Sequence, residues 1–341
     1  MARERLVSGS QVTPEEDKVQ LSLRPKNLSE YIGQGQLCGK LKVTLEAARQ
    51  RKEPVEHVLF YGPPGLGKTT LAHIIAREMD SRIFATAGPA LQRTGDLMGI
   101  LTNLNEGDIL FIDEIHRLSS TIEEFMYPAM EDFKVDFVVD KGAFAKVINV
   151  PLKRFTLVGA TTRAGMLSAP LRDRFGLYYH LDFYPPEELA EIIKRSAGLL
   201  EASIDDEAAL TVARRSRGTP RIANRLLRRV RDYAAVKADG VITPDLAAKA
   251  LDAEGVDSLG LDNLDRKLLQ IIIEYYKGGP VGIEALAATL NEEVDTLVDM
   301  VEPYLLKIGF IQRTRRGRMA APAAMEHLGI KRPGKSQQDL F

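Results

Sequence analysis

One glycine-rich segment limits what this chain can fold into more than any other feature. Residues 62–70 read Gly-Pro-Pro-Gly-Leu-Gly-Lys-Thr-Thr and match the pattern G-x-x-x-x-G-K-[ST]. An apolar run precedes the segment and helical spacing follows it. In that setting the glycines let successive backbone N–H groups point at phosphate oxygens, and the helix N-terminus adds its positive end. The segment predicts a P-loop for ATP, with Lys68 on the β- and γ-phosphates and the Thr69 hydroxyl on Mg²⁺.

A second motif supplies the acids that such a site needs. Residues 109–112 form an apolar run that ends in Asp113 and Glu114. We predict that Asp113 holds Mg²⁺ through water, while Glu114 orients and polarises the attacking water. Alone this pattern is weak, because many buried strands end in acids. Behind a P-loop it predicts ATP hydrolysis.

Three further groups fit a hydrolase. Thr162 ends a predicted strand where it can sense the γ-phosphate. Arg172 and Arg174 each offer an arginine finger, a group worth about 10³–10⁵ in rate; the alternative for either is a surface ion pair with Asp173. Arg221 starts a predicted lid helix whose end can face the nucleotide. The remaining arginines of this region are predicted to lie on a solvated or intersubunit face: Arg214, Arg215, Arg217, Arg225, Arg228, Arg229 and Arg231.

Short apolar runs separated by helical stretches occupy residues 58–183. The predicted strands are 58–61, 83–86, 109–112, 155–158 and 178–181. Continuous apolar residues predict strands covered on both faces, so we expect an α/β P-loop core with a parallel sheet flanked by helices. A helical lid and a C-terminal winged helix follow, and the helix start signals of the lid are Asp205, Thr219-Pro220 and Thr243-Pro244. The expected domains are an arm (1–20), the ATPase domain (21–184), the lid (185–256), the winged helix (257–330) and a polar tail (331–341).

An alternating segment interrupts the ATPase domain at residues 133–150. Apolar residues recur at every second position on either side of Asp140-Lys141-Gly142, which predicts a β-hairpin. An apolar hairpin face needs a cover, either its own domain or a protein partner. The residues proposed for a partner are Phe137, Phe144, Ile148 and Val150.

The C-terminal region carries a local basic cluster. Net charge is −1, so any contact with nucleic acid must come from such clusters. Arg313, Arg315, Arg316 and Arg318 lie on the predicted wing, whereas the third helix carries acids that phosphates would repel: Glu293, Asp295, Asp299 and Glu302. The wing predicts DNA binding through phosphates with little sequence preference. An exposed charged hairpin without a ligand and a protein-docking module are the alternatives.

Composition excludes several other classes. Cys38 is the only cysteine, which rules out an internal disulfide and a cysteine-rich zinc site. Residues 1–18 lack the apolar stretch of a signal peptide, and no apolar run reaches the roughly 20 residues of a membrane span. We expect a cytoplasmic protein without a membrane segment.

Taken together, several segments resemble the RuvB family, bacterial AAA+ motors that drive branch migration of Holliday junctions. The resemblance runs from about residue 20 to residue 330. The segments that carry it are Leu23-Arg24-Pro25, Tyr31-Ile32-Gly33-Gln34, residues 62–70, Asp113-Glu114-Ile115-His116-Arg117-Leu118, Gly159-Ala160-Thr161-Thr162-Arg163-Ala164-Gly165 and Gly218-Thr219-Pro220-Arg221-Ile222-Ala223-Asn224-Arg225.

The resemblance implies a ring-shaped homohexamer with nucleotide bound between subunits. It implies duplex DNA and Holliday junctions as substrates, RuvA as the partner of the hairpin, and the resolvase RuvC as a further partner. Arg174 becomes the finger supplied in trans, ahead of Arg172. Arg313 and Arg318 become DNA contacts, while Arg315 stands where we expect proline in the family. The implied nucleotide contacts are Leu23, Arg24 and Tyr184 near the adenine, Gly65, Lys68, Thr69 and Thr70 on the phosphates, Glu131, Asp132 and Phe133 by backbone contact, and Arg221 as the lid sensor.

These observations favour an ATP-driven branch-migration motor in DNA recombination and repair. A clamp-loader-like protein switch is the alternative from another class, and a protein unfoldase is a third. Salt-sensitive binding to plain duplex DNA supports the motor, whereas tight binding only to a ring-shaped protein supports the loader.

Overall fold

The computed structural model describes residues 21–139 and 146–330. These residues fall into two compact units, one up to Asp182 and one from Phe183 onward. The first unit holds a five-stranded parallel sheet in the order β2-β3-β6-β1-β7. Its strands are β1 (Val58–Tyr61), β2 (Ile83–Ala87), β3 (Ile109–Asp113), β6 (Thr156–Thr161) and β7 (Leu177–His180).

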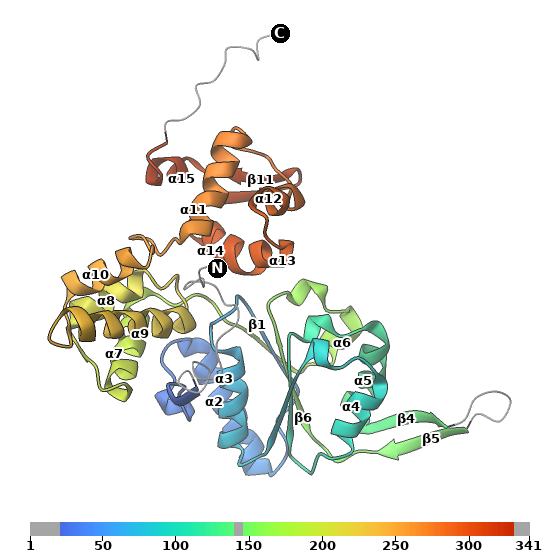
Figure 1. The fold of residues 1–341 in the computed structure, drawn as a ribbon. Coiled ribbons are helices and arrows are strands. Elements are labelled where there is room, and N and C mark those ends of the chain that lie inside the picture. The colour runs from blue at the N-terminus through green and yellow to red at the C-terminus, as the bar shows by residue number, and fades with distance from the viewer. Residues whose placement is uncertain (1–20, 140–145, 331–341) are drawn as a thin grey trace, which may run out of the picture. The chain divides into compact units, whose positions relative to one another are not determined.

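Helices cover both faces of this sheet, as Figure 1 shows. One face carries α2 (Gly35–Arg51) and α3 (Lys68–Glu78), and the other carries α4 (Thr94–Leu101), α5 (Ser120–Glu131) and α6 (Ala169–Asp173). Short 3₁₀ turns connect them at Leu28–Glu30, Gly88–Ala90, Ile115–Arg117 and Ala164–Met166. The buried central strands, with Phe60 and Phe111 at 0% and 2% exposure, confirm the predicted α/β class.

The sheet order determines where the motifs meet. β3 and β6 are neighbours, and β6 also pairs with β1, so the carboxyl ends of these three strands lie at one edge. In open parallel sheets ligands bind at this edge. The P-loop follows β1, the acidic pair ends β3, and Thr162 follows β6.

The predicted hairpin is present as β4 (Lys134–Val139) and β5 (Lys146–Pro151), which pair antiparallel. Val135 is fully buried in the core of its own unit, and Val150 packs against the same core. Ile148 is 48% exposed. The base of the hairpin therefore packs on its own domain, while Ile148, two residues from Val150 and so on the same face of β5, is exposed.

The second unit starts with the lid. Its helices are α7 (Pro186–Leu199), α8 (Asp206–Arg214), α9 (Pro220–Lys237) and α10 (Pro244–Ala253). The predicted start signals at Asp205, Thr219 and Thr243 are the N-cap residues of α8, α9 and α10. Two short strands, β8 (Ser203–Ile204) and β9 (Val241–Ile242), pair in parallel and were not predicted.

The winged helix completes the second unit. Helical segments pack on a common core, and the wing is the antiparallel pair β10 (Ile311–Thr314) and β11 (Gly317–Ala320). The helical segments are α11 (Asn263–Gln270), a π-helical turn (Ile271–Tyr275), α12 (Ile283–Leu290), α13 (Val294–Thr296), a second π-helical turn (Leu297–Val301), α14 (Glu302–Lys307) and α15 (Pro322–His327). No helix in the described ranges is long and apolar enough to cross a membrane.

Candidate functional site: an ATPase edge and an arginine-bearing wing

The P-loop has the curled backbone that its glycines permit. Gly62, Gly65 and Gly67 have φ angles of 140°, 81° and 106°. A Cβ atom at Gly62 would lie 2.3 Å from the Leu181 carbonyl oxygen, and one at Gly67 would lie 2.6 Å from the Tyr31 hydroxyl oxygen. Larger residues are therefore excluded at both positions, and the loop opens directly into α3 at Lys68.

The side chains that face this loop are the ones that phosphate and metal chemistry requires. Lys68 is only 7% exposed, and its ammonium donates to the Gly62 and Pro63 carbonyls at 2.7 and 2.9 Å. The Thr69 hydroxyl lies 3.3 Å from the Asp113 carboxylate. A hydroxyl and a carboxylate side by side are hard oxygen ligands that suit Mg²⁺. In the described part of the chain, no three His, Cys, Asp or Glu residues form a metal site.

The second acid is held apart from the first. Glu114 adopts φ 48° directly after β3. Its carboxylate lies 3.5 Å from the Thr162 hydroxyl and 3.2 Å from His116 Nδ1. His116 Nδ1 is also 2.9 Å from the Thr161 hydroxyl. Strands β3 and β6 thus bring Glu114 and Thr162 together, the arrangement needed for an acid that orients water beside a γ-phosphate sensor.

The residues expected near the adenine belong to different units. Leu23 is 2% exposed in the first unit, and Tyr184 is 2% exposed in the second. The Tyr184 amide donates to the Gly218 carbonyl at 2.9 Å, in the loop that leads to Arg221. Each unit therefore positions its own share of the expected adenine contacts.

Arg174 is held rigidly on the surface of the first unit. Its guanidinium donates to the Pro170 carbonyl at 2.6 Å and to Glu131 at 3.1 Å, and it lies 4.3 Å above the ring of Tyr127. Arg172 is exposed. The ion pair of Arg174 is thus with Glu131 rather than with Asp173, the alternative that the sequence left open. Tyr127 was not singled out from the sequence.

The segment after Glu131 has an unusual backbone. Phe133 adopts φ 51°, and its ring packs edge-on against Phe155 at 5.9 Å. The guanidinium of Arg154 lies 5.6 Å above the same ring, and Asp132 pairs with Lys134 at 3.0 Å. Packing of the Phe133 ring and the Asp132–Lys134 pair thus hold the segment that is predicted to line the nucleotide site.

Of the four hairpin residues proposed for a partner, Ile148 has the exposure that docking needs. Val150 contributes to the core of its own domain. Phe144 lies outside the described residues, and for Phe137 only the backbone is described, paired with Ile148.

The wing places two of its arginines on one buried acid. Arg313 and Arg318 face each other across β10 and β11, and both donate to Glu302. Arg313 does so at 3.1 and 2.5 Å, and Arg318 at 2.8 and 3.2 Å. The side chain of Glu302 is 3% exposed, compared with 53% for Arg313 and 16% for Arg318. We call these three residues the wing clamp.

The pKa of Glu302 shows which interactions dominate in the wing clamp. Burial on its own raises the pKa of Glu302, but hydrogen bonds from Arg313 and Arg318, with their charges, outweigh it and hold the pKa below its usual range. The prediction that Glu302 repels phosphates together with the other acids of its helix is wrong, because its carboxylate is buried and paired with two wing arginines. The sequence hinted at this pairing only through the several arginines of the wing, because nothing in the position of Glu302 marks it as buried.

The tip of the wing is different. Arg315 and Arg316 are exposed, and within residues 21–139 and 146–330 neither forms an ion pair. The Thr314 hydroxyl closes the turn by donating to the Gly317 carbonyl at 2.8 Å. A Cβ atom at Gly317 would lie 2.3 Å from the Val281 carbonyl oxygen, so the turn requires glycine at this position. The amide of Arg318 donates to the Val281 carbonyl at 2.8 Å and anchors the strand next to the turn. The tip thus presents two full positive charges on a fixed support.

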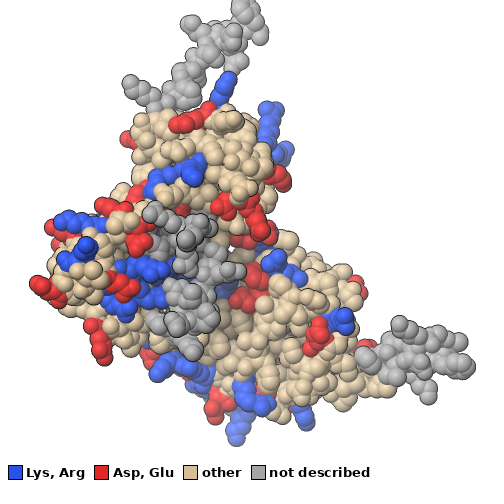
Figure 2. All heavy atoms as spheres, in the orientation of Figure 1, with Lys and Arg blue, Asp and Glu red and all other residues tan. Residues whose placement is uncertain are grey.

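Elsewhere the surface charges are mixed. On the face drawn in Figure 2, Lys and Arg side chains are interspersed with Asp and Glu. The predicted solvated arginine face is wrong for three residues, since Arg217, Arg225 and Arg228 are 2%, 4% and 9% exposed. Fold and sites together define a P-loop ATPase of the AAA+ class that carries a helical lid and a winged helix.

Comparison with known proteins narrows this class to one family. The Holliday junction DNA helicase RuvB P-loop domain matches residues 23–181, the RuvB AAA lid domain residues 184–257, and the RuvB C-terminal winged helix domain residues 258–329. The chain belongs to the RuvB family.

Solved structures agree with this assignment. Thermotoga maritima RuvB, described as a Holliday junction branch migration motor, is 52% identical, with 92% of this chain and 100% of that chain covered and a TM-score of 0.84. A variant of the same Thermotoga protein is also 52% identical, with 91% and 99% covered and a TM-score of 0.86. The resemblance inferred from the motifs is confirmed over the whole described length.

Proposed function

We propose that this chain hydrolyses ATP to ADP and phosphate and uses the reaction to drive branch migration of Holliday junctions in recombination and repair. The proposed working form is a ring of six subunits on duplex DNA in the cytoplasm. RuvA is the proposed partner, and the resolvase RuvC a second one. The observation that carries the proposal is the joint presence of a complete ATPase edge and an arginine-bearing wing on one chain.

The proposed chemistry assigns one task to each group at the sheet edge. Lys68 binds the β- and γ-phosphates, and Thr69 and Asp113 hold Mg²⁺, which neutralises charge that develops on the phosphates. Glu114 orients the attacking water, since its carboxylate is separate from the metal pair. Thr162, 3.5 Å from Glu114, links the water position to the γ-phosphate.

Arg174 is the proposed finger for the nucleotide of a neighbouring subunit. Its contacts with Glu131, the Pro170 carbonyl and the Tyr127 ring fix the guanidinium before any partner arrives. A preorganised cation lowers the barrier because it does not need to reorient as charge develops. The exposed Arg172 lacks this support.

DNA contact is proposed for the wing. Arginine side chains on a hairpin bind phosphates without reading bases, which suits a motor that must pass any sequence. The exposed tip supplies Arg315 and Arg316, and the wing clamp supplies Arg313 and Arg318 with fixed geometry.

The test is ATP hydrolysis by the purified chain, with and without duplex DNA at low salt. We expect DNA to raise the rate, Arg318→Ala to remove that stimulation, and Arg174→Ala to lose turnover while still binding ATP. Arg231→Ala, which removes an exposed pair with the adjacent Asp232, is the matched control and should leave both rates unchanged. If DNA changes nothing, the motor proposal fails and the protein-switch alternative is preferred.

A further inference from the structure

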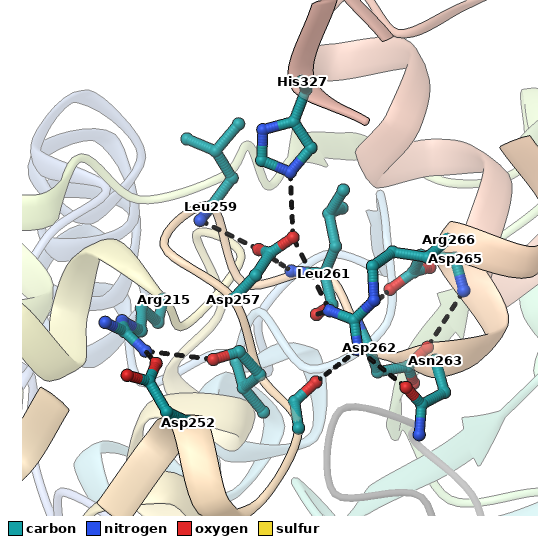
Figure 3. A network of polar contacts seen from close by, with 12 residues as sticks. Arg215, Asp252, Asp257, Leu259, Leu261, Asp262, Asn263, Asp265, Arg266 and His327 are labelled. Atoms are coloured by element: carbon teal, nitrogen blue, oxygen red, sulfur yellow. Dashed lines mark hydrogen bonds and ion pairs between the residues drawn. The ribbon is translucent and has the colours of Figure 1, made fainter. Parts of the chain in front are cut away.

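The segment that joins the lid to the winged helix, residues 254–262 between α10 and α11, is held by side-chain contacts on several sides (Figure 3). We call this segment the connection. Asp257 accepts hydrogen bonds from the amides of Leu259 and Leu261 at 3.0 and 2.8 Å. Its other oxygen lies 2.9 Å from His327 Nε2 on α15 and 3.6 Å from Arg266 on α11. Two elements of the winged helix thus hold one residue of the connection.

Arg266 extends this network to the backbone. Its guanidinium donates to the Leu261 and Gly255 carbonyls, both at 2.8 Å, and to the Asn263 side chain at 2.7 Å. The two ends of the connection are therefore tied to the first helix of the winged helix. Such a connection resists bending, unlike a polar linker that carries no contacts.

Contacts from the lid hold the connection as well. Arg215 pairs with Asp252 and donates to the Val256 carbonyl at 3.0 Å. Gly260 adopts φ 78°, and a Cβ atom there would lie 2.4 Å from the Arg215 carbonyl oxygen. The chain therefore turns back tightly against the lid.

One side chain crosses from the lid into the winged helix. Arg217 is 2% exposed and donates to the fully buried Asp265 at 3.0 Å and to the Met300 carbonyl at 3.1 Å. Its guanidinium also lies 4.8 Å above the ring of Tyr304. Breaking a buried ion pair strongly destabilises a fold, because one charge then stays buried without its counter-charge. The Arg217–Asp265 pair therefore favours the one placement of the winged helix against the lid in which both charges meet.

Tyr304 adds a second contact at the same place. Burial raises the pKa of Tyr304 to about 12, so the phenol keeps its proton. The hydroxyl donates to the Leu259 carbonyl at 2.7 Å. The ring that receives Arg217 is therefore itself bound to the connection.

Arg217 immediately precedes the part of the lid expected to contact nucleotide. It adopts φ 54°, and the next residue, Gly218, accepts a hydrogen bond from the Tyr184 amide at 2.9 Å. Arg221 follows at the start of α9. A shift of this loop on nucleotide exchange would thus act directly on Arg217.

We propose that Arg217 is a positioning residue that transmits movement of the nucleotide-sensing loop to the winged helix, so that lid and DNA-contacting wing move together. The proposal rests on the proposed motor function. It adds that the connection is rigid and does not act as a hinge, and that the Arg217–Asp265 pair is the contact that links it to the nucleotide-sensing loop.

The first test compares ATP use with DNA movement in the full chain. We expect Arg217→Met to keep basal ATPase and duplex binding, while junctions migrated per ATP hydrolysed fall by about fivefold or more, the lower end of typical coupling between sites. Arg231→Met is the matched control, because that arginine lies on the same lid and, among the residues that the structure describes, pairs only with its exposed neighbour Asp232. Unchanged migration per ATP in Arg217→Met overturns the proposal.

A second variant separates coupling from folding. Arg217→Met together with Asp265→Asn removes both charges of the buried pair. The amide oxygen of Asn can still accept the hydrogen bond that Asp265 takes from the Asp262 amide at 2.8 Å. We expect this double variant to fold and to remain uncoupled. Restored coupling in the double variant overturns the proposal, since the loss in the single variant would then come from the buried charge left on Asp265 and not from the missing contact.

A distance measurement decides the point without activity. Cys38 is the only cysteine, so Cys38→Ser gives a background for spin labels. Val236 on the lid and Tyr275 on the winged helix are 77% and 78% exposed and suit labelling through cysteine. We expect one narrow distance distribution, which broadens in Arg217→Met. A distance distribution that stays narrow in Arg217→Met overturns the proposal that Arg217 holds the winged helix against the lid. If the unsubstituted chain moves no DNA, the motor proposal fails, and this measurement still decides whether Arg217 holds the connection.

Discussion

Replacing Arg315 and Arg316 by alanine removes two unpaired charges from the tip of the wing. Replacing Arg313 and Arg318 removes two charges that share one carboxylate. The two double variants delete the same number of arginines from the same hairpin. The structure nevertheless predicts that they differ in how DNA binding depends on salt.

The expected size follows from counterion release. Each phosphate neutralised contributes about 0.9 to the slope of log K against log salt, or about eightfold in affinity at 0.1 M. The tip pair therefore accounts for about 1.8 in slope and about 60-fold in affinity. The two single tip variants should each show about half of this slope change.

The wing clamp carries a net charge of one, because two guanidiniums share Glu302. Removing either arginine leaves a neutral pair and lowers the slope by about 0.9. Removing the second leaves Glu302 buried without a cation, so burial raises its pKa and the carboxyl takes up a proton. The clamp stays neutral, and the second substitution adds little.

The assay is fluorescence anisotropy with a short duplex of arbitrary sequence, in sodium chloride from about 50 to about 200 mM without Mg²⁺, the range over which phosphate contacts dominate. Additive losses at the tip and non-additive losses at the clamp are expected. Additive losses of about 1.8 at both pairs would refute the reasoning about Glu302. No change of slope at the tip would refute phosphate contact there.

Three further outcomes are expected. Arg174→Ala lowers ATP turnover by about 10³–10⁵-fold and retains nucleotide binding, measured with a fluorescent ATP analogue. Arg172→Ala lowers turnover only slightly. Equal losses of turnover in the two variants would contradict the assignment of Arg174 as the finger. Burial lowers the pKa of His57, whose ring bridges the Met130 carbonyl and the Leu157 amide. The unfolded chain then binds more protons below about pH 6.5, so the free energy of unfolding falls as pH falls, by at most about 1.4 kcal/mol per pH unit. Urea titrations of the unsubstituted chain and of His57→Gln at two pH values check this. An equal pH dependence in both chains would contradict it. Ile148→Glu weakens RuvA binding in a pull-down and spares basal ATPase, while loss of both would indicate a folding role.

Sequence reasoning captured the elements that depend on local pattern. The run at 58–61 is β1, and the N-caps Asp205, Thr219 and Thr243 start helices as predicted. The meeting of the P-loop with Asp113 also followed, because parallel strands bring their carboxyl ends to one edge. These features are set by residue spacing and strand direction, both visible in a sequence.

Contacts between distant positions were not predictable in the same way. Asp265 lies 48 positions from Arg217, and no local period relates them. Glu302 had been read as a surface acid of a helix, yet the helix turns it under the wing. The hairpin face was read as uniform, but its base is buried at Val135 while Ile148 is exposed. In each case tertiary packing, rather than periodicity, decides the environment.

The central claim is that ATP hydrolysis at the sheet edge moves a DNA junction. The most direct measurement follows a synthetic Holliday junction with fluorescent arms, in the presence of this chain, RuvA, ATP and Mg²⁺. We expect ATP-dependent separation of the arms that is lost in Glu114→Gln, which keeps nucleotide binding but cannot orient water. An unsubstituted chain that binds the junction and hydrolyses ATP, yet leaves the arms in place, would contradict the account.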